Sequence, residues 1–249
     1  MPAASGSAYL ELATPSPSSS KSLLYATSSL KLICSIHGPK PVPRTSSFSP
    51  NLQLNAHVKL APFAANQRRG YIRDAGERDL SVQLEAALKG AIIPDRWPKS
   101  AIDVIVTVLE GEDDNSISDG LSSGKGVDGA GMMSVLAGCL TVASAALADA
   151  RIDCLELLAG GLAAVVPTID RKVTTVLDPC PIEHEALRSV CVVGYLPTRD
   201  ELTLVWVKGD LPGSGEEGFD RLVDSAVNAA KGVQSIIQEA VRESTERKM

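Results

Sequence analysis

Four arginines lie close together in an otherwise acidic chain, and their chemistry is that of phosphate recognition. They are Arg68, Arg69, Arg73 and Arg78, between a predicted strand and a predicted helix. A guanidinium group can donate two parallel hydrogen bonds to phosphate oxygens, which suits arginine to such contacts. The pattern supports two interpretations: a loop that faces a nucleic-acid backbone, or a solvated surface loop without a ligand.

Other residue types that could do chemistry lack a convincing arrangement. Asp178 and Glu183 are candidate carboxylate ligands, although an ordinary solvated turn accounts for both. The three histidines include no pair at the spacing of metal ligands, and no Ser, His and Asp set suggests a hydrolytic triad. The glycines of GKGVDG (124–129) have the spacing of a dinucleotide-binding loop, but the required strand does not directly precede them. The residues themselves predict neither a metal ion nor a cofactor.

The chain is acidic and poor in aromatic residues, which limits its direct role with nucleic acids. It has 249 residues, a net charge of −6 and 4% aromatic residues. Phosphate neutralisation supplies most of the affinity for nucleic acids, so an acidic chain is poorly suited to bind them alone. It could still contribute a local basic patch to a larger surface.

Nothing in the sequence indicates export or a membrane. The N-terminus lacks the charged and then apolar pattern of a signal peptide. The most apolar run, from Leu157 to Val166, is ten residues long, and a membrane span needs about twenty. Five cysteines without CxxC spacing predict reduced, mostly buried thiols. We therefore expect a soluble, intracellular protein.

Hydropathy patterns divide the chain into the strands and helices of one compact unit. Alternating or β-branched runs predict strands at 30–36, 52–60, 102–109, 173–177, 189–196 and 202–208. Helical spacing predicts helices at 79–91 (with Gly76 before it), 132–149 and 219–241, and a buried helix leading into a strand at 154–166. We expect an α+β fold in a single domain over 1–249, with a Ser/Pro-rich insertion at 13–29 and a polar loop insertion at 110–131.

Five segments in the correct order resemble the RNase PH superfamily. They are GSAYLEL with LKLICSIHGP, GERDLSVQLEAALKGAI, DRWPKSAIDVIVTVL, SVLAGCLTVASAALADA and LDPCPIEHEALRSVCVVGY. Two runs, RRGYIRDAGERDLSVQLEAAL and ADARIDCLELLAG, resemble the mRNA-transport-regulator type of subunit in the eukaryotic RNA exosome core ring of fungi. The resemblance implies a single RNase PH-like domain of the ribosomal protein S5 domain 2-like class, in which a mixed sheet packs with helices.

The resemblance also predicts where a reaction centre has been lost. Active members hold inorganic phosphate with a Gly-Thr-Arg turn at a helix N-terminus, and the threonine and arginine positions fall on Val135 and Leu136. Their two catalytic aspartates bind a divalent ion, and those positions fall on His184 and Val190. A valine can neither hold a metal ion nor move a proton.

A third departure lies on the first predicted helix, where family members present arginines to the RNA backbone. Those positions fall on Val82 and Ala86. Three independent losses predict a non-catalytic subunit. The alternative is an active phosphorolytic 3′-to-5′ exoribonuclease with Asp178 and Glu183 as metal ligands. A further alternative is a free-standing globular protein without an RNA role.

The resemblance implies a structural role in the exosome ring, supporting 3′-to-5′ RNA processing and degradation in rRNA maturation and mRNA turnover. The implied partners are another RNase PH-like subunit in a heterodimer of a six-member ring, S1- and KH-domain cap proteins and single-stranded RNA, with no membrane. Arg68, Arg69 and Arg73 are expected to line the RNA path, with Arg78 holding the loop to the helix start. The implied location is the nucleus and nucleolus, and also the cytoplasm.

Overall fold

A computed structural model describes residues 3–13, 29–42, 49–64, 74–111, 130–167, 173–179, 187–211 and 216–248. The strands are β1 (Gly6–Ala13), β2 (Ser29–Pro41), β3 (Gln53–Leu60), β4 (Ser100–Glu110), β5 (Ala159–Pro167), β6 (Val173–Leu177), β7 (Ser189–Leu196) and β8 (Glu201–Gly209). The helices are α1 (Ala75–Ala91), α2 (Ala130–Asp149) and α3 (Glu216–Lys248), with a 3₁₀ turn at Pro94–Arg96.

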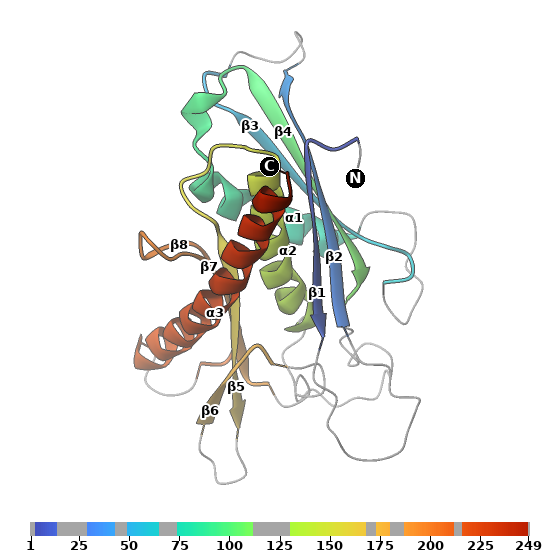
Figure 1. Cartoon of the computed structure of the whole chain (residues 1–249). Helices are drawn as coiled ribbons and strands as arrows, with labels where there is room; N and C mark the ends of the chain where they lie inside the picture. Colours follow the sequence, from blue (N-terminus) through green and yellow to red (C-terminus); the bar gives the residue numbers. More distant parts are fainter. Residues whose placement is uncertain are drawn as a thin grey trace.

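The strands form two four-stranded sheets, with helices between and beside them (Figure 1). The first sheet has the order β1-β2-β4-β3 and the second the order β6-β5-β7-β8. β3 pairs with β4 in parallel, whereas the other described pairings are antiparallel. α2 lies between the sheets and touches β1, β2, β5 and β7, while α3 packs on β5 and β7 from the other side. The expected α+β class is confirmed.

The small side chains of α2 let both sheets approach it closely, as the sequence predicted. A Cβ on Gly138 would lie 2.7 Å from the side chain of Leu32, and a Cβ on Gly160 of β5 would lie 2.1 Å from the carbonyl oxygen of Ala137. Thr141 Oγ1 also accepts a hydrogen bond from the Gly160 amide at 3.2 Å. α2 is the one described helix that is long and apolar enough to cross a bilayer, but most of it is buried inside the fold. It is therefore the central core helix.

The segment before β5 is not the buried helix that its apolar sequence predicted. Residues 155–156 form a bend and 157–158 have no regular secondary structure, so the chain enters β5 without a preceding helix. Gly160 packs against α2, and a Cβ on Gly161 would lie 2.1 Å from the carbonyl oxygen of Ala226 in α3. A strand covered by helices on both faces is apolar on both sides, so the alternation that marks a strand disappears.

α1 begins four residues earlier than its hydrophobic pattern indicated. Asp74 caps the helix, and its side chain and that of Glu77 form a capping box. Gly76 therefore lies inside the first turn, where a Cβ would meet Met132 of α2 at 2.6 Å. The sequence Asp-Ala-Gly-Glu carries the capping-box spacing, which was the signal for the true start.

α1 also closes the free edge of β3, the last strand of the first sheet. Val58 N donates to Ser81 Oγ and Leu60 N donates to Glu77 Oε1, both at 2.9 Å. The side chains of Ser81 and Glu77 are almost fully buried. Backbone donors that would otherwise be unpaired at the sheet edge are therefore satisfied within the chain.

Two of the segments that carry the family resemblance meet in space. Gly6 of β1 approaches the end of α2 so closely that a Cβ would lie 2.3 Å from the amide nitrogen of Ala150. The Ser7 amide donates to Asp149 Oδ2 at 3.1 Å. The Gly-Ser-Ala start and the Leu-Ala-Asp-Ala end of α2 thus form one contact that joins β1 to the core helix.

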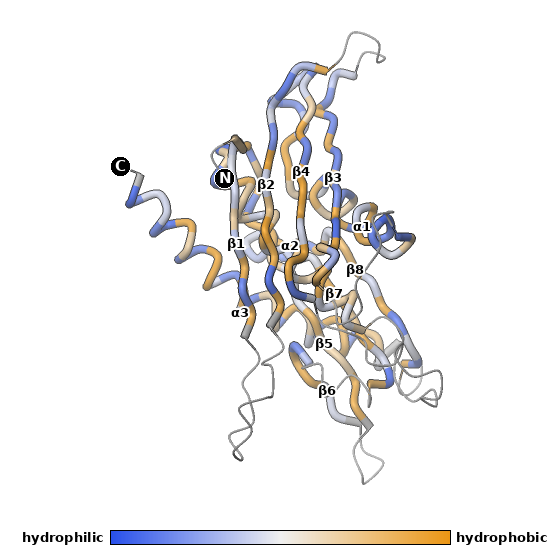
Figure 2. Tube along the Cα trace, turned by 90° about the vertical axis from the view of Figure 1, so that its right-hand side faces the viewer, coloured by the Kyte–Doolittle hydropathy of each residue, from blue (hydrophilic) through white to orange (hydrophobic). Residues whose placement is uncertain are grey.

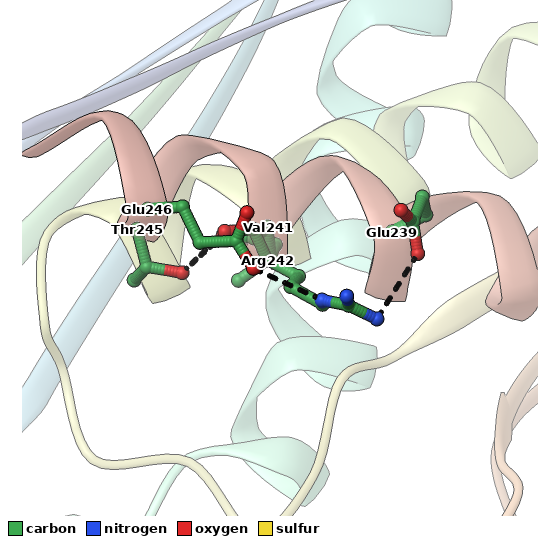
Figure 3. A network of polar contacts seen from close by, with 5 residues as sticks. All are labelled: Glu239, Val241, Arg242, Thr245 and Glu246. Carbon is green, nitrogen blue, oxygen red and sulfur yellow. Dashed lines mark hydrogen bonds and ion pairs between the residues drawn. The ribbon is translucent and has the colours of Figure 1, made fainter.

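The last turns of α3 project from the body of the molecule and depend on contacts within the helix (Figures 2 and 3). Ile237 is the last fully buried residue of the described helix. Arg242 pairs with Glu246 at 3.2 Å and with Glu239 at 3.9 Å. Such pairs one turn apart stabilise an exposed helix modestly.

The division into one domain remains a proposal, and α2 supports it. Most of α2 belongs to the larger hydrophobic core, while Ala145 packs against the second. The predicted insertions lie mainly outside the described residues, but Ala13, Ser29, Glu110 and Ala130 at their ends belong to strands or to α2.

Candidate functional site

The positions expected for phosphate binding are part of the hydrophobic core. Val135 and Leu136 lie in α2 and are 3% and 0% exposed. The anion-binding capacity of a helix resides in the unpaired N–H groups of its first turn. α2 begins at Ala130, so Leu136 lies beyond that turn. Neither the side chains nor the backbone can hold a phosphate ion at this place.

Val190, at one of the two expected metal-binding positions, is also sealed inside the protein. It lies on β7, is 0% exposed, and pairs in register with Ala164 and Lys208. Val190 and Leu136 belong to the same core. The other position, His184, lies outside the described residues, as does Glu183.

Asp178 lies in an exposed turn at the end of β6. Its backbone is in the left-handed region with a φ of 49°, and its amide donates to the carbonyl of Leu162 at 3.0 Å. The protein around its carboxyl group partly removes water and so raises the pKa of Asp178. Because the residue as a whole is exposed, this preference for the neutral form is small. In the part of the chain that the structure describes, no three His, Cys, Asp or Glu side chains gather as metal ligands would.

The cysteines offer no nucleophile among the described residues. Cys34, Cys139 and Cys191 are buried free thiols, and Cys154 is partly buried. Burial raises the thiol pKa of Cys34 and of Cys191 to about 12, so the reactive thiolate is scarce at neutral pH. The predicted reduced state is consistent with this placement; Cys180 lies outside the described ranges.

The candidate RNA-facing residues belong to the segment before α1 or to the start of α1. Arg68, Arg69 and Arg73 lie outside the described residues, whereas Arg78 is exposed on α1. Val82 and Ala86 follow Arg78 at helical spacing on the exposed face, and Val82 is 63% exposed. Helix α1 therefore exposes apolar Val82 and Ala86 at the two positions where the resemblance predicted arginines in active members, one turn or more after Arg78.

Phe63 was missed by the sequence reasoning. It lies just before residues 65–73, which are outside the described ranges, and is 73% exposed. An exposed aromatic ring next to a basic loop is the combination that stacks and neutralises single-stranded nucleic acid. The available signal was a phenylalanine among small and polar residues in APFAANQ, in a chain with three phenylalanines.

Comparison with known proteins decides the family. The model of the 3′ exoribonuclease family, domain 1 (RNase PH), matches residues 1–153. The chain belongs to the RNase PH family. The resemblance inferred from five short segments is thereby confirmed over more than half of the chain.

Similar proteins in fungi are named as exosome components. "Exosome complex component MTR3" of Chaetomium thermophilum is 48% identical over 243 residues, which cover 98% of this chain and 82% of that protein. "Exosome complex component mtr3" of Schizosaccharomyces pombe is 27% identical over 219 residues, covering 87% and 76%. The predicted similarity to the fungal type of subunit is therefore confirmed.

A solved structure confirms the RNase PH-type fold. Rrp46 of rice (Oryza sativa) matches with a TM-score of 0.65 at 17% identity, covering 86% of this chain and 84% of that one. At this identity the match supports the fold and nothing further.

Proposed function

We propose that this chain is a non-catalytic subunit of an RNA exosome ring, where it supports 3′-to-5′ RNA processing and degradation. One observation carries the proposal: Leu136 and Val190, at two positions where active family members need polar groups, are 0% exposed in one hydrophobic core. We infer the exosome as the assembly because the similar fungal proteins are named as exosome complex components.

The physical argument concerns desolvation. A phosphate ion and a divalent cation need a concave site lined by polar groups. Aliphatic side chains packed between α2 and β7 exclude both ions, and a charge placed there without a partner costs several kcal/mol. The packing and the residue types at these positions both support the proposed non-catalytic character.

The role that remains is structural and concerns the RNA path. We assign the chain to a heterodimer with another RNase PH-like subunit in a six-member ring, capped by S1- and KH-domain proteins. The loop with Arg68, Arg69 and Arg73, together with Phe63 and Arg78 beside it, faces single-stranded RNA. The corresponding locations are the nucleus, the nucleolus and the cytoplasm, where rRNA maturation and mRNA turnover take place.

Activity provides the first test. The purified chain with single-stranded RNA, Mg²⁺ and inorganic phosphate should release no nucleoside diphosphates. Asp178→Asn is the matched variant, because an active enzyme would need this carboxylate. Release by the natural chain that disappears in Asp178→Asn overturns the proposal in favour of an active phosphorolytic exoribonuclease.

Assembly provides the second test. Mixed with RNase PH-type ring subunits, the chain should elute in a stoichiometric complex on size-exclusion chromatography with light scattering. A chain that stays monomeric with every such partner contradicts the ring assignment and supports a free-standing protein.

The RNA path is tested by removing charge from the loop. Changing Arg68, Arg69 and Arg73 to alanine in the assembled ring should weaken RNA binding about equally for all sequences, because phosphate contacts carry no base information. The log–log salt slope should fall by about 0.7 for each lost contact. The control changes Arg242 and Arg247 at the projecting end of α3, which should leave the slope unchanged. Unchanged affinity and slope in the loop variant would show that the arginines are only solvated.

A further inference from the structure

β8 is an apolar edge strand whose outer edge no described element covers. It is the last strand of the second sheet, has nine residues, and lies at the outer margin of the fold (Figure 1). Its centre, Leu-Thr-Leu-Val-Trp-Val (202–207), carries no charge, proline or glycine. Leu202 and Val205 are 41% and 40% exposed. Soluble proteins usually protect such edges with charges, proline or a covering element, because a bare edge pairs with other chains.

The register shows which backbone groups of β8 are free. Asp210 N donates to the carbonyl of Arg188 at 3.0 Å, and the pairing continues as Val190 with Lys208 and Val192 with Trp206. In an antiparallel pair, hydrogen-bonded residues alternate with residues whose N–H and C=O groups point the other way. The even-numbered residues 204–208 therefore bond to β7. The backbone groups of Val205 and Val207 point out of the sheet.

The helices do not close this edge. α3 packs on β5 and β7. α1 meets β8 at Gly90, where a Cβ would lie 3.0 Å from the side chain of Thr203. That contact lies at the start of β8 and leaves Val205 exposed. No described residue bonds to the outward backbone groups of Val205 and Val207.

We propose that β8 pairs antiparallel with an edge strand of a neighbouring RNase PH-type chain, so that the second sheet continues across the subunit boundary. This inference rests on the proposed function and names the element that makes one of its contacts. Backbone hydrogen bonds would supply affinity, and the side chains of Leu202 and Val205 would be covered.

The charges at the two ends of β8 indicate the pattern of the partner strand. Glu201 is exposed at the start, and Lys208 lies near the end with its ammonium group 4.8 Å from the centre of the Trp206 ring. An antiparallel strand of the same type, with an acidic start, an apolar centre and a basic end, brings opposite charges together at both ends. This chain's own β8 has the required pattern, and the ring assignment leads us to propose the equivalent strand of a related chain as its partner.

Residue-resolved amide hydrogen exchange tests the pairing directly. In the isolated full chain, the outward amides of Val205 and Val207 should exchange much faster than the inward amides of Leu204 and Trp206. Assembly with ring partners should slow the two outward amides at least about tenfold, while the inward amides serve as the internal control. A partner that contacted only the side chains of β8 would not slow the outward amides selectively.

Two variants at one position separate the backbone contribution from that of the side chain. Val205→Pro removes an N–H that the fold does not use, a placement that edge strands tolerate. It should weaken partner binding at least about tenfold, or about 1.4 kcal/mol. Val205→Thr keeps the N–H and the shape, and should bind nearly as well as the natural chain. Thermal unfolding of both variants reports whether the fold is intact. If proline disturbs the fold, amide exchange in the natural chain decides whether β8 pairs with the partner.

Each outcome has a distinct meaning. A complex that forms while Val205 and Val207 still exchange fast overturns the β8 pairing but leaves the ring assignment standing. Protection of these amides in a homodimer of the isolated chain overturns the choice of a related neighbour and identifies a second copy instead. Failure to form any complex contradicts the proposed function itself.

Discussion

Val190 and Val205 lie on neighbouring strands of the same sheet, and the fold places them in opposite environments. Val190 on β7 is 0% exposed in the core between α2 and the sheet. Val205 on β8 is 40% exposed at the sheet edge. At the first position an apolar residue fills the core where the family resemblance predicted the place of a catalytic aspartate. At the second, an apolar residue remains available to another chain. The proposed loss of catalysis and the proposed pairing of β8 therefore both depend on a valine, and only its place in the sheet differs.

The largest expected effect comes from the same substitution at both positions. Val190→Asp should lower the free energy of unfolding by more than about 3 kcal/mol, because it buries a charge without a partner. Val205→Asp should cost less than about 1 kcal/mol in the isolated chain, because the carboxylate stays in water. Urea unfolding measures both. Equal losses would mean that β8 is as tightly enclosed as the core.

A smaller effect is expected at the edge of β3, which side chains of α1 close. Ser81→Ala removes the hydroxyl that accepts from Val58 N at 2.9 Å and donates to the Glu77 carbonyl at 2.6 Å. A buried amide left without a partner should cost about 1–2 kcal/mol.

The control for the closed edge is a serine with only a helical contact. Ser225 on α3 is exposed and donates to the Arg221 carbonyl at 2.8 Å. Ser225→Ala should stay within about 0.5 kcal/mol of the natural chain. If Ser81→Ala is equally mild in urea unfolding, the β3 edge does not depend on α1 in the way that the geometry indicates.

The smallest effect concerns the turn that positions β8. Tyr195 Oη donates to Asp200 Oδ1 at 2.5 Å, and this hydrogen bond, together with burial, raises the pKa of Tyr195 to about 12. A raised pKa means that the stabilisation is fully present below the ordinary value of 10.0 and is lost as the pH rises through about 12. The natural chain should therefore lose stability over that window relative to Tyr195→Phe. Parallel alkaline profiles of the two proteins in thermal unfolding would contradict this.

Much of the fold was accessible to sequence patterns because the elements carry local signals. The alternation from Leu52 to Leu60 predicted β3, and the structure places it at Gln53–Leu60. The apolar stripe of the last helix predicted α3. The start of α1 was missed because apolar periodicity begins only at Leu80, while the capping residues Asp74 and Glu77 are polar. β5 was partly misread because helices cover both of its faces.

The candidate site divides in the same way. The residue types at positions 135, 136, 190 and 82 predicted the loss of the family's chemistry, since aliphatic side chains bind neither phosphate nor metal ions. The order of the five family-like segments carried the family assignment. These conclusions require only covalent sequence and a family pattern, because they depend on which functional groups are present.

Tertiary structure decided which apolar residues are sealed and which are open. Leu136 and Val190 meet in one core because α2 packs against β7. Val205 has similar neighbours in sequence but stays exposed, because β8 is the last strand of the sheet and α3 packs on β5 and β7 instead. Burial depends on what lies across a sheet or at its edge. That information comes from segments far apart along the chain, which no local pattern contains.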